Sequence, residues 1–459
     1  MTTRHRQLSH FLALLVVGAP SALLWPAVGR YALDSQSHAA TTATSDKSDV
    51  AQIDLHALDS PRLSGLAREL NRGNREALPA FWADVKGNTP LVEAGAEDHR
   101  RFVTFLWQGD QKTTGVSVLG GLPSANVVKP LRRLGDTDVW YLTESHASEA
   151  RFAYLFQVNG PPAIAMELRA IMEAMRRNPP RPDALHTREY AGWSYVELPD
   201  APPQPWIVRQ ADIPRGRQTN ERLKSRIEIQ EYRLNIYTPP GYKDDGERCW
   251  LMIAFDGGFG MMDIILDNLR SAGEIPPLVV VGVENGGPES RQRDLDCSDS
   301  FASFLANELV PWARAKYRVY DDPAHTAVGG TSLGGKMAVY CGLRHSDVFG
   351  NVLSQSGSFL TAPGEETPRA LWSGESPGLL ARRFVERPPL PLALYIEVGR
   401  YETTLPNSML LETRRLRDVL QAKGYRVTYS EFVGGHNEVC WRGSFANAIK
   451  ALTSARPVK

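Results

Sequence analysis

The sequence predicts an α/β protein in which a doubly wound, mostly parallel sheet follows a small β-sandwich. From about residue 226 onward, strand-like and helix-like segments alternate, which is typical of a sheet covered by helices on both faces. Several strands there are unbroken apolar runs, as expected for strands buried on both sides. Upstream, short apolar strands separated by Gly, Asp and Pro indicate a sandwich.

The elements expected in the C-terminal part follow from these patterns. Strands are expected at residues 232–237, 250–255, 277–283, 326–329, 351–354, 391–398 and 426–432. Helices are expected at residues 300–317, 336–344 and 409–423. A parallel order of strands and crossover helices accounts for this alternation.

The N-terminal part has a different texture. Residues 61–82 have helical periodicity, and strands are expected at 102–107, 115–119, 139–142 and 151–156. Proline-rich stretches at 178–182 and 199–205 indicate a linker. We therefore predict a targeting segment at 1–40, a flexible spacer at 41–60, a sandwich and linker at 61–205, and a catalytic domain at 206–459.

Composition narrows the classes of function. The 459 residues are 42% hydrophobic and 23% charged, and 52 basic side chains balance 52 acidic ones. Such a chain has no overall field that attracts nucleic acid or an anionic membrane, so neither is expected as a partner. The four cysteines form no C-x-x-C pair, which argues against a zinc knuckle, and one disulfide is expected only if the protein is exported.

The first 40 residues have the pattern of a secretory signal. Arg4 and Arg6 precede an uncharged apolar run at 11–25, and small residues around Ala39 suit a cleavage site. The apolar run is short for a membrane-spanning helix. We expect a periplasmic or otherwise exported protein; an inner-membrane anchor, and a cytoplasmic protein with a non-functional leader, are the alternatives.

A nucleophile is indicated by the pentapeptide around Ser332. Gly330-Thr331-Ser332-Leu333-Gly334 matches the G-x-S-x-G elbow, a sharp turn between a strand and a helix that exposes the serine hydroxyl. A strand is expected directly before it and a helix directly after it. This context predicts an α/β-hydrolase with Ser332 as the nucleophile; the alternative is a glycine-rich turn with a capping serine.

The order of later residues supplies a base and an acid. His436 follows two glycines after the last expected strand, where α/β-hydrolases carry their histidine. Glu402 follows the strand before that and is expected to orient the imidazole. Asp418 lies inside the next helix and is a poorer candidate, and a Ser–His pair acting alone is the alternative. His325 and His345 are interpreted as surface residues.

An oxyanion hole requires two backbone N–H groups directed at the developing negative charge. The amide of Leu333, just after the nucleophile, is expected to be one. The other is expected in the loop that follows the strand at 250–255, where Asp256-Gly257-Gly258 offers bare amides. We predict that Gly258 supplies it.

In several segments the chain resembles the enterochelin (enterobactin) esterases. The matching segments are VTFLW at 103–107, DTDVW at 136–140, the Asp256-Gly257 turn, residues 291–297, GTSLGG at 330–335, NVLSQSGS at 351–358, residues 396–402 and GGHNEVCWR at 434–442. Members of this family hydrolyse the ester bonds of the cyclic trilactone of 2,3-dihydroxybenzoyl-serine, so that iron leaves the siderophore.

The resemblance implies a substrate and further site residues. It implies an immunoglobulin-like shape for the N-terminal sandwich, and it assigns Ser332, His436 and Glu402 the roles already inferred. Arg291, Arg293, Arg442 and Trp441 become candidates for contact with the catecholate substrate; ordinary surface charge is the other interpretation of the arginines. No cofactor is expected, since iron enters only as part of the substrate.

Alternatives remain at this stage. The best-known family members are cytoplasmic, whereas this chain begins with an export-like segment. A broader carboxylesterase acting on feruloyl or acetyl groups of polysaccharide, an acyltransferase on the same fold, and a binding protein without catalysis also fit the pattern. The sequence makes no prediction of oligomeric state.

Overall fold

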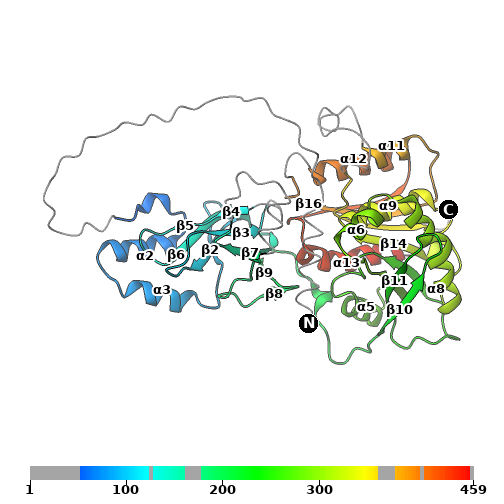
Figure 1. Ribbon diagram of the computed structural model, residues 1–459, viewed down its shortest axis with the longest axis horizontal. Coiled ribbons are helices and arrows are strands. Elements are labelled where there is room, and N and C mark those ends of the chain that lie inside the picture. The colour runs from blue at the N-terminus through cyan, green and yellow to red at the C-terminus, as the bar shows by residue number, and fades with distance from the viewer. Residues whose placement is uncertain (1–51, 123–127, 161–176, 360–377, 404–407, 455–459) are drawn as a thin grey trace.

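The computed structural model describes residues 52–122, 128–160, 177–359, 378–403 and 408–454. The chain forms a β-rich N-terminal unit and a larger α/β unit that lie side by side (Figure 1). The expected targeting segment at 1–40 lies outside the described residues. Among the helices that are described, none combines the length and apolarity needed to cross a membrane.

Two antiparallel sheets form the N-terminal unit. Their strand orders are β1-β2-β6-β5 and β4-β3-β7-β9-β8. The strands are β1 (Leu91–Ala94), β2 (Arg100–Gln108), β3 (Val116–Gly120), β4 (Val128–Pro130), β5 (Arg132–Arg133), β6 (Val139–Ala147), β7 (Arg151–Val158), β8 (Glu189–Tyr190) and β9 (Trp193–Glu197).

Alternation along the strands builds two cores in this unit. In β2, Phe105 faces the other sheet, where it meets Phe152 and Tyr154 of β7. The next residue, Leu106, faces the opposite way because successive strand side chains point to opposite faces. It packs against the helices α2 (Pro61–Asn71) and α3 (Ala77–Val85), which cover the outer side of the four-stranded sheet.

The expected spacer at 41–60 is wrong for its last residues. Residues 54–57 form a short turn that includes η1 (Leu55–Ala57), capped by the Asp54 carboxylate. Ile53, Leu55 and Leu58 pack against the core beneath α2 and α3. Their apolar side chains gain from burial there, so this stretch belongs to the N-terminal unit.

An eight-stranded sheet forms the centre of the α/β unit. In spatial order its strands are β10 (Arg217–Lys224), β11 (Glu231–Thr238), β13 (Leu278–Val283), β12 (Trp250–Ala254), β14 (Thr326–Thr331), β15 (Asn351–Gln355), β16 (Ala393–Gly399) and β17 (Arg426–Phe432). The pairs β10–β11 and β11–β13 are antiparallel, and the other pairs are parallel.

Helices cover both faces of this sheet, as a doubly wound fold requires. One core lies under α7 (Asp299–Phe304), η3 (Leu305–Leu309), α8 (Val310–Lys316), α9 (Leu333–Arg344), α11 (Leu379–Val385) and α12 (Met409–Ala422). The opposite core lies under α5 (Met262–Ser271) and α13 (Glu438–Thr453). The fold class predicted from the sequence is confirmed.

One strand and four α-helices of the α/β unit were missed. Strand β10 lies at the sheet edge and consists of charged and polar residues apart from Leu223, so it has no apolar run. Helices α5, α6 (Pro288–Leu295), α11 and α13 also went unpredicted. The signal for α13 was present: Asn437 caps it, and Trp441, Phe445 and Ile449 recur every four residues.

The two proline-rich stretches have different roles in the fold. The proline-rich stretch at 178–182 is not a linker, because Arg181 and Phe156 exchange two backbone hydrogen bonds inside the sandwich. The stretch at 199–205 does join the two units. All four cysteines are described and unpaired, and three of them are buried, so the conditional disulfide is absent here.

Candidate active site

Ser332 occupies a strained turn between β14 and α9. Its backbone has φ 56° and ψ −121°, a conformation that residues other than glycine rarely adopt. The Ser332 amide donates to the Gln355 carbonyl on the adjacent strand at 2.9 Å, which holds the turn in place. This is the geometry expected of a nucleophile elbow.

The glycines around Ser332 are required by close backbone approach. A Cβ on Gly330 would lie 2.7 Å from the carbonyl carbon of Gly334, the second residue of α9. A Cβ on Gly335 would lie 2.7 Å from the Ser354 hydroxyl oxygen on β15. The elbow therefore admits no side chain at either position without a shift of the helix away from the sheet.

His436 lies between Ser332 and Glu402. Its Nε2 is 3.0 Å from the Ser332 hydroxyl oxygen, and its Nδ1 is 2.7 Å from Glu402 Oε2. All three side chains are buried. The residues come from three separate elements: the start of α9, the loop after β16, and the loop after β17. The structure thus brings together the three residues that the sequence predicted.

Glu402 is fixed by two further donors. Its Oε1 accepts hydrogen bonds from the Ser356 hydroxyl at 2.6 Å and from the Gly399 amide at 2.8 Å. Both bonds leave Oε2 directed at the imidazole. Ser356, which no motif indicated as part of the site, directly follows the end of β15, beside the elbow strand.

Trp441 lies against this set of residues. Its indole N–H donates to the Ser356 hydroxyl oxygen at 2.9 Å, and its ring meets the His436 ring edge-on at 4.7 Å between centroids. The prediction placed Trp441 on the substrate. Trp441 also lines the cleft described below, but it bonds to Ser356 and packs on His436, so it supports the imidazole first.

A second buried carboxyl group lies on β16, the strand that precedes the loop with Glu402. Glu397 of β16 has no solvent exposure, and it accepts hydrogen bonds from Gln355 Nε2 and from the Tyr395 hydroxyl, each at 2.8 Å. Burial raises the pKa of Glu397 to about 7. No sequence motif marks Glu397 as a buried residue.

The predicted oxyanion donors flank the elbow. Leu333 is the first residue of α9, where the amides of the first turn have no partner inside the helix. Gly258 follows β12 with φ 118°. Its amide donates to the Phe255 carbonyl at 3.0 Å, so a substrate oxygen would share or replace that acceptor. Leu333 is therefore the better placed of the two.

A cleft adjoins these residues, with about 580 Å³ of empty space that is partly open to solvent. Its walls are Asp256, Gly258, Phe259, Gly260, Arg291, Thr331, Gln355, Glu438, Trp441 and Arg442. Two of these side chains are acidic and two are basic, and one acidic and one basic side chain, Asp256 and Arg291, are paired with each other. The described part of the wall is therefore balanced in charge.

The three predicted arginines have different surroundings. Arg291 of α6 donates from Nε and Nη2 to the Asp256 carboxylate at 2.6 and 2.9 Å, while its Nη1 is buried with no partner in the described chain. The prediction that Arg293 contacts the substrate is corrected. It is absent from the cleft wall, its side chain is half exposed, and it pairs with Asp294 at 2.7 Å. Two positions along a helix turn the side chain to another face.

Arg442 reaches the N-terminal unit. Its guanidinium lies between the rings of Tyr190 and Tyr195, at 4.6 and 4.7 Å from their centroids. It is buried, and its Nε donates to Gln204 Oε1 at 3.0 Å. Its predicted contact with substrate is limited to the edge that borders the cleft.

Other candidate groups lie elsewhere. His325 and His345 are half-buried rather than on the surface, and they lie at the end of β14 and of α9 that is remote from Ser332. Within the described ranges, no three His, Cys, Asp or Glu side chains gather in a way that could hold a metal ion.

Comparison with known families divides the chain as the structure does. Residues 102–207 match the family described as enterochelin esterase, N-terminal, and residues 225–452 match the family described as putative esterase. These ranges correspond to the sandwich and to the α/β unit.

Individual relatives match most of the chain. An iron(III) enterobactin esterase of Dickeya dadantii is 28% identical over 428 residues, which cover 85% of this chain and 96% of the relative. One of Yersinia enterocolitica is 30% identical over 291 residues, covering 56% of this chain and 82% of the relative. The crystal structure of an enterobactin esterase from Shigella flexneri, determined in the presence of enterobactin, has a TM-score of 0.64 at 25% identity, and covers 81% of this chain and 97% of its own.

Proposed function

The chain belongs to the enterochelin esterase family and is a carboxylic ester hydrolase, and from that premise we propose that it opens enterobactin-type catecholate siderophores. In this proposal it hydrolyses the ester bonds of the trilactone and releases dihydroxybenzoyl-serine units, so that iron is freed. The observation that carries the proposal is the hydrogen-bonded chain from Ser332 through His436 to Glu402, beside an open cleft.

The first half of the proposed mechanism forms an acyl-enzyme. Ser332 attacks a lactone carbonyl carbon while His436 Nε2 takes the proton from the Ser332 hydroxyl. Glu402 stabilises the imidazolium that results, because its Oε2 already lies 2.7 Å from Nδ1. The tetrahedral intermediate then collapses, and the seryl oxygen of the substrate leaves with the proton from His436.

The second half repeats these steps with water. His436 takes a proton from a water molecule, whose oxygen attacks the ester carbonyl joined to Ser332. Collapse of this intermediate returns the proton to the Ser332 oxygen and releases the carboxylic acid. The Leu333 amide, and the Gly258 amide if it gives up its bond to Phe255, stabilise the oxyanion in both halves.

One position in the cleft is suited to bind an acidic oxygen of the substrate. The unpartnered Nη1 of Arg291 is a donor that a catecholate oxygen would satisfy. The proposed chemistry uses only groups of this chain, and iron takes part as a component of the substrate. Treatment of the purified enzyme with EDTA should therefore leave hydrolysis of the iron-free trilactone unchanged.

A substrate panel tests the proposal. The purified protein is given enterobactin, its ferric complex, feruloyl sugars and acetylated sugars at equal concentration, and products are separated by chromatography. We expect dihydroxybenzoyl-serine products and the highest kcat/KM on a catecholate trilactone. A higher kcat/KM on a feruloyl or acetyl ester would transfer the assignment to a polysaccharide esterase.

We further propose that the chain is exported, on the basis of the basic start, the uncharged run at 11–25 and the small residues near Ala39. The test is fractionation of a C-terminally tagged full-length chain in a Gram-negative host, followed by N-terminal sequencing. Periplasmic protein that begins after residue 37–40 supports the proposal. Full-length protein in the cytosol contradicts it, and full-length protein in the inner membrane identifies an anchor.

A further inference from the structure

The residues that follow His436 connect the active site with the N-terminal sandwich. Helix α13 begins just after the histidine, and adjacent helix residues diverge by about 100° around its axis. Trp441 therefore faces His436, while Arg442 faces the sandwich. One turn of helix carries both contacts, so a change in one should be felt at the other.

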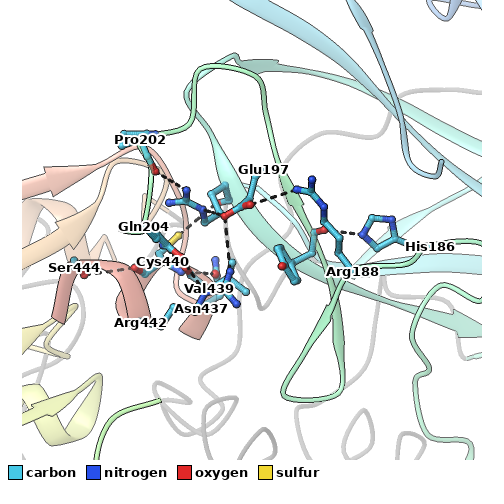
Figure 2. A network of polar contacts seen from close by, with 12 residues as sticks. His186, Arg188, Glu197, Pro202, Gln204, Asn437, Val439, Cys440, Arg442 and Ser444 are labelled. Atoms are coloured by element: carbon cyan, nitrogen blue, oxygen red, sulfur yellow. Dashed lines mark hydrogen bonds and ion pairs between the residues drawn. The ribbon is translucent and has the colours of Figure 1, made fainter. Parts of the chain in front are cut away.

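The contacts of Arg442 are numerous for one side chain. It lies between Tyr190 and Tyr195. It also donates to Gln204 and has Glu197 at 3.8 Å (Figure 2). Gln204 in turn donates from Nε2 to the Val439 carbonyl at 2.8 Å, which adds a second tie to the first turn of α13. A buried cation between two aromatic faces is favourable and directional.

The sandwich also contacts the loop that carries the histidine, residues 433–437, called here the histidine loop. The Arg151 amide on β7 donates to the Val433 carbonyl at 3.2 Å, and the Cys440 thiol donates to the Arg151 carbonyl at 3.4 Å. The Arg151 side chain binds Glu197 and the Pro202 carbonyl, each at 2.6 Å. The histidine loop is thus held at its start by β7 and at its end by the partners of Arg442.

We propose that Arg442 is a positioning residue through which the sandwich holds the histidine loop, so that His436 stays within reach of Ser332 and Glu402. This inference rests on the proposed serine esterase activity. A positioning role differs from a role in substrate binding in what it affects. As a positioning residue, Arg442 affects every ester that Ser332 attacks, including esters too small to contact the sandwich. A displacement of about 1 Å at a reacting group can lower a rate about 100-fold.

The experiment measures Arg442→Met on two substrates and one probe. The substrates are phenyl acetate and enterobactin, and the probe is a fluorophosphonate that reacts with Ser332. We expect kcat to fall about 10- to 100-fold on both esters by a similar factor, with KM for phenyl acetate unchanged. The probe should label one serine per chain, as in wild type, but at a rate lowered by the same factor. An unfolded fraction would instead lower the final labelling.

Two further variants sharpen the test. Arg442→Lys keeps a cation between the rings but loses the bond from Nε to Gln204, so it should restore part of the lost rate. Gln204→Leu removes the bonds to Arg442 and Val439 at nearly constant volume, and it should reproduce a smaller loss without disturbing the stacked rings. It also covers the case in which Arg442→Met does not fold.

Arg188→Met is the matched control. Arg188 binds the same Glu197 at 3.3 Å, but its side chain is 56% exposed and this contact lies within the sandwich. Its removal should leave all rates unchanged. Losses confined to enterobactin, no loss in Arg442→Met and Gln204→Leu, or an equal loss in Arg188→Met would each overturn the inference. A wild type that reacts with the probe yet cleaves no trilactone would refute the proposed function alone, since labelling rates still report on Arg442.

Discussion

At the scale of single residues, the site depends on groups whose conformations are fixed by neighbours. Ser332 keeps a positive φ because its amide is tied to Gln355 and because glycines let α9 approach the sheet. Glu402 accepts three hydrogen bonds, of which one is from His436. Backbone strain, and a carboxylate held by several hydrogen bonds, are expected where a side chain must stay in one place for chemistry.

The charge of Glu402 is expected to matter more than its shape. Glu402→Gln keeps the volume and leaves an oxygen for Ser356 and Gly399, but it offers His436 Nδ1 no anion and favours the wrong tautomer. By analogy with the same change in a serine protease triad, we expect kcat to fall about 10³- to 10⁴-fold with little change in KM. Steady-state kinetics on enterobactin and on phenyl acetate measure this.

The control for that substitution is Asp418→Asn on α12. Asp418 is the other acidic candidate in the sequence, and its side chain is 63% exposed beside Arg417. Its kinetics should equal those of the wild type. A Glu402→Gln enzyme with wild-type kcat would show that Ser332 and His436 act as a pair.

Glu397 makes stability depend on pH in a direction opposite to that of most carboxylates. Burial raises its pKa from 4.5 to about 7 in the folded chain, so the folded state binds more protons between these values. The contribution of Glu397 to the free energy of unfolding is thus fully present below pH 4.5 and is lost as pH rises through 7, by up to about 3 kcal/mol.

Glu397→Gln isolates this effect, because the amide stays neutral at every pH. Relative to wild type, the variant should become more stable as pH rises from 5 to 8, since only the wild type must ionise a buried group. Thermal melts of both proteins at pH 5, 6.5 and 8 provide the comparison. A difference in Tm that stays constant across this range would contradict the raised pKa.

At the scale of elements, the sequence predicted what depends on neighbouring residues. The elbow was found because strand, turn and helix are consecutive, and the order of Ser332, Glu402 and His436 followed from the alternation of strands and helices. The role of Ser356 and its bond with Trp441 were missed, because they depend on contacts between residues 46 and 85 positions apart. Gly258 was placed correctly in the loop, but the bond of its amide to Phe255 was not foreseeable from composition.

Gly434 lies where the histidine loop passes close to the sandwich. A Cβ there would lie 2.5 Å from the Cys440 sulfur and 3.0 Å from the Arg151 carbonyl oxygen. Gly434→Ala should therefore destabilise the protein by about 1–3 kcal/mol and lower kcat by shifting His436. Chemical denaturation and kinetics on phenyl acetate measure the two effects.

Gly65→Ala is the comparison for that substitution. Gly65 lies within α2, and nothing is within 4 Å of the position its Cβ would take. Because alanine is a better helix former, this variant should be about 0.5–1 kcal/mol more stable, with unchanged kinetics. Equal behaviour of the two alanine variants would show that the approach of the loop to the sandwich is not tight.

At the scale of the whole molecule, the sequence predicted two units but not how they meet. The interface depends on Arg442, which was predicted to bind substrate, and on Tyr190, Tyr195 and Gln204, which no motif marks. Each contact joins residues far apart in the chain, so no local pattern encodes it. The sandwich contributes to the active site as a support for the histidine loop as well as a neighbour of the cleft.

In the proposed function, Ser332 opens a catecholate trilactone. The most direct measurement is a chromatographic time course of the purified protein with enterobactin, alongside a Ser332→Ala variant of equal melting temperature. We predict dihydroxybenzoyl-serine products from the wild type and a rate lowered about 10⁶-fold, to background, in the variant. Trilactone hydrolysis by Ser332→Ala at the wild-type rate would contradict the account.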